Sequence, residues 1–135
     1  MTRLLPFVAL LALTACKTDG PVDDPLAALP IGSQWQVVTL SGAPVPEGVL
    51  VTIERPEAGV IAGSSGCNRY NGHLAAKDGH VSIGALAGTR MMCAPPQMQV
   101  ETAFHSVIGG VTVLRQAGET LELIAGQQVL ITARK

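Results

Sequence analysis

The sequence has few aromatic side chains, no cluster of basic residues and no long hydrophobic run. Its aromatic residues are one Trp, one Tyr and two Phe, so a core must be built mainly from Val, Ile, Leu and Ala. Because the basic residues are scattered, the chain lacks the electrostatic footprint of a nucleic-acid-binding protein. The apolar stretch at residues 4–13 is shorter than the roughly 20 residues that a transmembrane helix needs.

Catalytic motifs are missing as well. The sequence contains no Gly-x-Ser-x-Gly, no His-Glu-x-x-His and no phosphate-binding loop. Cys93 with His73 or His105 is the one Cys/His combination for nucleophilic catalysis, and a disulfide at Cys93 would abolish it. The sequence therefore predicts a protein that is not an enzyme, with no cofactor and no metal.

Residues 1–15 have the pattern of a signal peptide. Arg3 supplies the positive charge, an apolar run follows, and the run ends in small residues. The sequence Leu-Thr-Ala-Cys at positions 13–16 resembles the bacterial lipobox, in which cleavage leaves a lipid-modified cysteine as the first mature residue. Cys16 is then the anchor to the membrane. An ordinary signal peptide followed by an unrelated cysteine is the alternative.

Residues 16–33 are rich in Pro and Asp, which oppose both helix and sheet. We interpret them as the anchor and a flexible tether that holds a domain at residues 34–135 away from the membrane. Lys17, in place of an aspartate directly after the anchor, favours the outer membrane, with the domain facing the periplasm. Removal of Arg3 with the signal peptide leaves eight basic residues against ten acidic ones.

The remaining two cysteines predict a disulfide. The chain has three cysteines, and the predicted anchor accounts for the odd one. In an oxidising compartment Cys67 and Cys93 would pair, which would stabilise the fold by roughly 3–4 kcal/mol in the chain-entropy model. A zinc site formed with His73 and His80 is the alternative, although the usual C-x-x-C or H-x-x-x-H spacing is absent.

Alternating apolar residues and turn signals predict strands along most of the chain. The Asp78-Gly79 pair is the strongest hairpin signal. The predicted strands cover residues 34–40, 49–54, 60–62, 72–77, 80–83, 111–116, 120–124 and 129–134. A corner is expected at residues 63–66.

One segment has helical periodicity. Its apolar positions follow the i, i+3, i+4, i+7, i+8 pattern: Val100, Ala103, Phe104, Val107 and Ile108. Two prolines at positions 95–96 suit the helix start, and glycines at positions 109–110 suit its end. The sequence therefore predicts a mainly β protein with one inserted α-helix (α+β), built as a small, strongly curved antiparallel sheet or barrel.

Three groups of residues form paired motifs around the two cysteines: Gly66, Cys67, Asn68, Tyr70 and Gly72, then Ile83, Gly84, Leu86, Thr89, Met91 and Cys93, then Glu101 and Phe104. These motifs resemble the META domain, the family of HslJ-like envelope proteins named for a heat-inducible member. The resemblance covers about residues 33–133 and implies a barrel-like β-rich fold, export to the envelope and often a lipid anchor. It implies a link to heat shock and stress, and it supplies no catalytic residues.

We interpret the polar residues of these motifs mainly as structural. Asn68 suits a tight corner, because Asn tolerates left-handed backbone and bonds its own main chain. Thr89 is expected to bond backbone in the loop before Cys93, and Tyr70 to lie at the edge of the core. Arg69 and Arg90 flank the two cysteines, so a disulfide would bring them close enough for an anion or partner contact.

These observations predict a non-enzymatic, lipid-anchored envelope module that binds a partner protein or supports envelope integrity under stress. One alternative is a carrier of an acyl chain or another small apolar ligand inside the sheet. A second alternative is an inhibitor of a cell-wall hydrolase.

Overall fold

The structure is a computed structural model that describes residues 23–135. The predicted signal peptide and the Cys16 anchor lie outside the described residues. Within residues 23–135, no helix is long and apolar enough to cross a membrane. The elements in chain order are β1 (Gln34–Leu40), β2 (Ala43–Pro44), β3 (Leu50–Glu54), β4 (Val60–Gly66), β5 (Arg69–Lys77), β6 (His80–Ile83), β7 (Ala87–Gly88), α1 (Pro95–Ile108), β8 (Val113–Ala117), β9 (Thr120–Ala125) and β10 (Gln128–Arg134).

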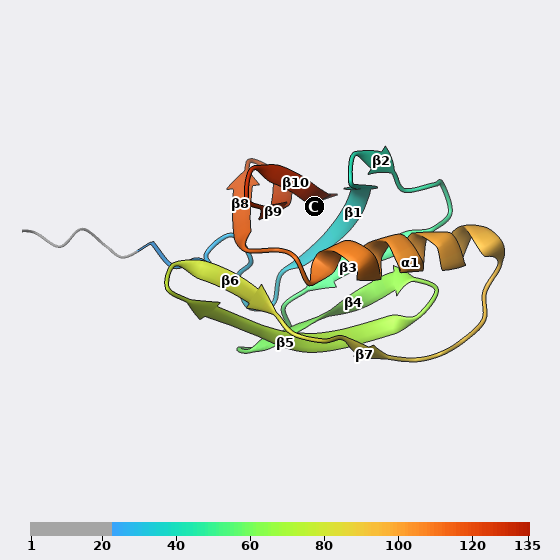
Figure 1. The fold of residues 1–135 in the computed structure, drawn as a ribbon, viewed down its shortest axis with the longest axis horizontal. Coiled ribbons are helices and arrows are strands. Elements are labelled where there is room, and N and C mark those ends of the chain that lie inside the picture. Colours follow the sequence, from blue (N-terminus) through green and yellow to red (C-terminus); the bar gives the residue numbers. More distant parts are fainter. Residues whose placement is uncertain (1–22) are drawn as a thin grey trace, which may run out of the picture.

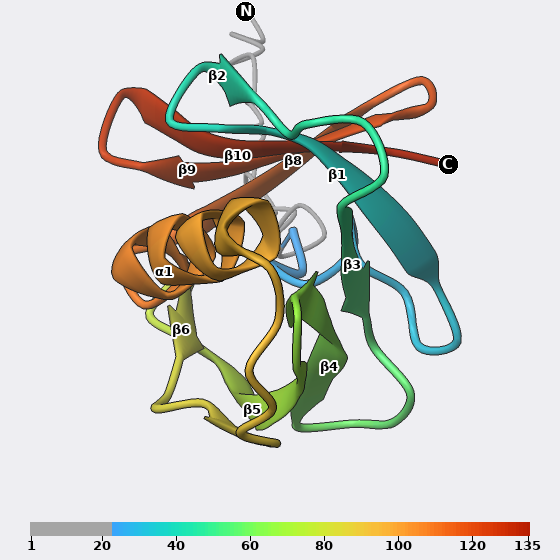
Figure 2. The same cartoon turned by 90° about the vertical axis from the view of Figure 1, so that its right-hand side faces the viewer.

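The strands form one antiparallel sheet that curls without closing into a barrel (Figures 1 and 2). Its order is β6-β5-β4-β3-β1-β10-β9-β8, with β2 added beside β1 and β7 beside β5. Register shifts in β1 and β10 mark irregularities of the β-bulge kind, which increase local bending. A backbone hydrogen bond of 2.8 Å, from the Val81 N–H of β6 to the carbonyl of Thr112 just before β8, links the two edge strands. The predicted fold class is confirmed.

Helix α1 lies against the concave side of the sheet, as Figure 2 shows. Val100, Phe104 and Ile108 are buried, so the predicted apolar stripe is the face that packs. The helix begins with two prolines, which suit positions whose N–H groups have no partner within the helix. It ends at Gly109, which keeps an ordinary right-handed backbone with φ −70°.

The interior between helix and sheet is filled by side chains. Trp35 and Phe104 are fully buried, and they are the largest members of a core that otherwise consists mainly of aliphatic residues. The rings of Tyr70 and Phe104 lie 5.0 Å apart, which joins β5 to α1. This packed interior gives no support to the expectation of a hollow sheet that carries an apolar ligand.

Most strands agree with the sequence pattern, but the region of β4 corrects it. The turn at Asp78-Gly79 forms with positive φ at both residues, as predicted. The short strand at residues 60–62 in fact continues through the glycine- and serine-rich stretch that was expected to be a corner. Only glycine fits at position 63, because β3 passes very close. A Cβ at this position would lie closer to the Thr52 carbonyl oxygen than van der Waals contact allows.

The tether predicted to end at residue 33 already contains core residues. Leu29 is fully buried and Leu26 is 8 % exposed. Asp24 accepts a hydrogen bond from the Leu26 N–H at 2.9 Å, and the Arg55 guanidinium donates to the Leu29 carbonyl at 2.9 Å. The packed part of the chain therefore begins upstream of residue 34, because two leucines within the Pro- and Asp-rich segment have a place in the core.

We expect Gly63→Ala to lower the free energy of unfolding by roughly 2 kcal/mol or more, since its Cβ would push β3 and β4 apart. Urea unfolding followed by the fluorescence of Trp35 measures this. The matched control is Gly109→Ala, where nothing lies within 4 Å of the added Cβ. Equal stability of the two variants would contradict this account of β4.

Candidate functional site

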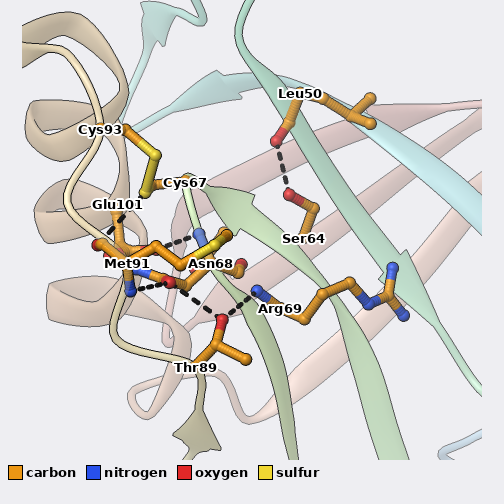
Figure 3. The surroundings of a disulfide bond; sticks show 10 residues. Leu50, Ser64, Cys67, Asn68, Arg69, Thr89, Met91, Cys93 and Glu101 are labelled. Carbon is orange, nitrogen blue, oxygen red and sulfur yellow. Dashed lines mark hydrogen bonds between the residues drawn. A yellow bond between two sulfur atoms is a disulfide. The ribbon is translucent and has the colours of Figure 1, made fainter.

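The two motif segments meet at the corner between β4 and β5. Cys67 and Cys93 form a disulfide with their Cα atoms 5.8 Å apart, and it joins this corner to the residues that precede α1 (Figure 3). The bonded sulfurs are not thiolates, so they provide neither the zinc ligands nor the cysteine nucleophile that the sequence left open. The bridge closes a loop with a sequence separation of 26 residues.

Asn68 is the centre of the polar contacts at this corner. Its side-chain N–H groups donate to the Met91 carbonyl at 3.1 Å and to Glu101 at 2.9 Å. Its side-chain oxygen accepts from the Met91 N–H at 2.6 Å and from the Thr89 hydroxyl at 2.9 Å. The amide thus uses two donors and two acceptor positions, which is its full capacity. An aspartate has the same shape but lacks the two donors.

This arrangement corrects the interpretation of Asn68. The residue has no positive φ, and its side chain bonds distant segments in place of its own main chain. The side chain is buried, so an unpaired amide there would be costly. Asn68 therefore fixes the loop before α1 to the β4–β5 corner.

Glu101, on α1, completes the cluster. One carboxylate oxygen accepts from the Ser65 hydroxyl at 2.6 Å and from the Asn68 N–H at 2.8 Å, and the other accepts from the Asn68 side chain. We call Ser65, Asn68, Thr89, Met91 and Glu101 the corner cluster. It joins β4 and the β4–β5 corner to the loop and the helix through one carboxylate and one amide.

The carboxylate is ionised because its environment favours the charge. Partial burial raises the pKa of Glu101, but hydrogen bonds from Ser65 and Asn68, together with the nearby His105, outweigh that effect and hold the pKa below its ordinary value. Hydrogen bonds to a charged group are stronger than neutral ones. The cluster is therefore both a structural joint and an acid-sensitive one.

Gly66 lets the helix approach this corner. Its φ of +121° disfavours other residues, and a Cβ there would lie 2.9 Å from the Gln97 carbonyl oxygen of α1. Tyr70 and Phe104 pack beneath, and the Tyr70 hydroxyl donates to the Thr52 carbonyl at 2.8 Å. Burial raises the pKa of Tyr70, so it stays a neutral donor. Tyr70 is a core residue, only 2 % exposed.

Thr89 bonds backbone, but on β5 in place of its own loop: its hydroxyl accepts from the Arg69 N–H at 3.2 Å. The Arg69 guanidinium pairs with Glu54 on β3 at 3.3 Å and points away from Thr89 (Figure 3). The pairing lowers the pKa of Glu54. The Arg69 guanidinium is thus engaged by Glu54, and the anion or partner contact expected of Arg69 and Arg90 stays a prediction.

Sequence reasoning missed two features of this region. Ser65 is fully buried and bonds Glu101, a role that the inward alternation of Ile61, Gly63 and Ser65 along β4 could have indicated. An apolar surface beside the cluster was also missed. Met91 is 57 % exposed and Met92 is 87 % exposed, on a loop whose backbone the cluster holds.

Two uncharged hollows lie along α1, which follows this loop in the chain. They have volumes of about 390 and 200 Å³ and flank Gln99, and no charged side chain lines either of them. We call Met91, Met92 and the residues of both hollows the α1 platform. The lining residues are Pro95, Met98, Gln99 and Thr102 in one hollow, and Leu40, Ala43, Pro44, Val45, Pro46, Gln99, Val100 and Ala103 in the other.

Comparisons with known proteins agree with this architecture. The family model of the META domain matches residues 26–135, so the chain belongs to the META domain family. It is similar to heat shock protein HslJ of Escherichia coli (strain K12), with 30% identity over 145 residues that cover 100% of this chain and 92% of the relative. The resemblance inferred from the motifs is confirmed.

Two solved structures have the same fold. An NMR structure of a protein from Burkholderia xenovorans has a TM-score of 0.64 and 26% identity, and it covers 98% of this chain and 97% of its own. A second NMR structure has a TM-score of 0.58 and 25% identity, with 75% and 86% coverage. The likeness extends over nearly all of the described residues in the first case.

We expect Glu101→Gln to cost about 1–3 kcal/mol of stability at pH 7 and much less near pH 3. The pKa of Glu101 is lowered from 4.5, so its stabilising effect is present above that value and is lost as the pH falls through the folded pKa. Urea unfolding of both proteins at the two pH values measures the difference. Glu54 is present in both proteins, so its own effect on the pH dependence of stability cancels from the difference. An equal cost at both pH values would contradict the assignment.

Proposed function

We propose that this META domain protein is a non-enzymatic, lipid-anchored module of the bacterial cell envelope that binds a partner protein through the α1 platform. The observation that supports binding is the exposed, uncharged surface itself. Met91 and Met92 expose much of their side chains, and both hollows beside α1 are lined without charge. Exposed apolar patches of this kind are typical of interaction sites, where Met is enriched.

The platform is also rigidly supported. The loop that contains the two methionines is fixed by the disulfide and by two hydrogen bonds between the Met91 main chain and the Asn68 side chain. A surface that is already ordered loses little conformational entropy on binding. This supports a recognition role for a loop that has no regular structure apart from the two residues of β7.

The partner that fits is an amphipathic helix or a similarly apolar protein surface. Neither hollow offers a charge to pair with, so binding relies on burial of Pro, Met, Val and Ala side chains. The filled interior favours this role over that of an internal carrier of an acyl chain. The lipobox-like sequence before Cys16 supports the proposed anchor.

The test is site-specific photocrosslinking in the envelope of a bacterium that expresses the full chain. With the crosslinker at position 92 or 99 we expect a discrete adduct with another protein, and none with it at position 78. Asp78 lies in the β5–β6 turn, at the far end of the molecule's long axis from the start of α1 (Figure 1). The purified adduct partner should then bind the chain about tenfold more weakly when Met98 is changed to Glu.

Two results would overturn the proposed role of the α1 platform. One is the same adducts from positions 78 and 92, and the other is an unchanged affinity of the Met98→Glu variant for the partner. The anchor is tested separately with Cys16→Ser. We expect this variant to lose acyl labelling and membrane fractionation. If it keeps both, the anchor is wrong while the platform stands.

A further inference from the structure

A third hollow lies on the outer face of the sheet, away from the α1 platform. It has a volume of about 270 Å³ and is lined by Gln34, Gln36, Leu50, Thr52, Arg134 and Lys135. These residues come from three neighbouring strands and the chain end, because β1 lies between β3 and β10 in the sheet (Figure 2). The hollow is therefore formed where three strands of the sheet lie side by side.

The lining of this hollow has positive charge without an acidic side chain. Arg134 and Lys135 supply two cations, and within residues 23–135 neither forms a salt bridge. The acids on adjacent strands are already engaged, Glu54 with Arg69 and Glu122 with Arg115. The field of the two free cations is therefore not cancelled by side chains next to them.

Hydrogen-bond donors stand beside these charges. Gln36 is the cross-strand partner of Arg134, and Gln34 follows two residues away on the same side of β1. The Lys135 ammonium lies 4.8 Å from the centre of the buried Trp35 ring, which points to the opposite side of β1 from Gln34 and Gln36, so Lys135 adds positive charge at the margin of the hollow. The Arg134 guanidinium and the two amides belong to the hollow itself, and this donor set suits a tetrahedral oxyanion.

We propose that this hollow binds a phosphate group, either free phosphate or the phosphodiester of a phospholipid headgroup. Arg134 would bind two of its oxygens, the two glutamines would be further donors, and Lys135 would add positive charge nearby. We expect weak affinity, about millimolar. This site does not depend on the α1 platform or on the proposed partner.

Trp35 is a built-in reporter, because it is the only tryptophan of the chain and Lys135 lies over its ring. The full chain is titrated in nonionic detergent with inorganic phosphate at constant ionic strength, with chloride as reference. We expect a saturable fluorescence change with phosphate alone. Arg134→Gln should weaken it about tenfold, whereas Lys77→Gln, which removes a charge on the β5–β6 hairpin, should leave it unchanged.

The source of the phosphate is separated by two further titrants. Glycerophosphoglycerol, an anionic headgroup without acyl chains, should bind more tightly than phosphate if the natural ligand is a lipid. Tighter binding of inorganic phosphate would assign the hollow to the free ion. No saturable change with either compound, or the same change in Arg134→Gln with an unaltered melting temperature, would overturn the site.

Discussion

The carboxylate of Glu101 is the interaction on which the rest of the structure depends. It accepts hydrogen bonds from Ser65 and from both the backbone and the side chain of Asn68, so the only helix of the described residues is attached to the sheet at one charged point. The Asn68 side chain in turn holds the main chain of Met91 through two hydrogen bonds. Because the buried amide has all its partners, any movement of the loop leaves polar groups unsatisfied.

The sequence motif is thereby explained as a set of folding requirements. Gly66 admits the helix, the disulfide closes the loop, and Tyr70 and Phe104 fill the space beneath. Binding is then left to surfaces that this frame holds in place. The α1 platform and the hollow at Arg134 lie on different faces, so a protein and an anion could be bound at the same time.

Local patterns predicted the strands, the Asp78-Gly79 turn and the helix, because alternation and periodicity are properties of neighbouring residues. They failed where a residue serves a distant contact. The glycines and serines of β4 look like a corner, yet they allow close approach of Thr52 and α1. Asn68 looks like a turn residue, yet its main partner is 33 positions away. The α1 platform was missed because its residues at 91–103 fit an ordinary loop and helix, and the residues at 40–46 join them only in the fold.

The most direct test of the central claim is a double-mutant cycle of Asn68→Asp and Glu101→Gln, with unfolding measured in urea at pH 7. Each single change should destabilise the protein, and Asn68→Asp more so, because it places two carboxylates in contact. In the double variant the amide and the acid exchange places, and only the contact with the Met91 carbonyl stays unfavourable. We predict a favourable coupling free energy of about 1.5 kcal/mol or more. Additive costs would contradict the claim that this pair joins the helix to the sheet.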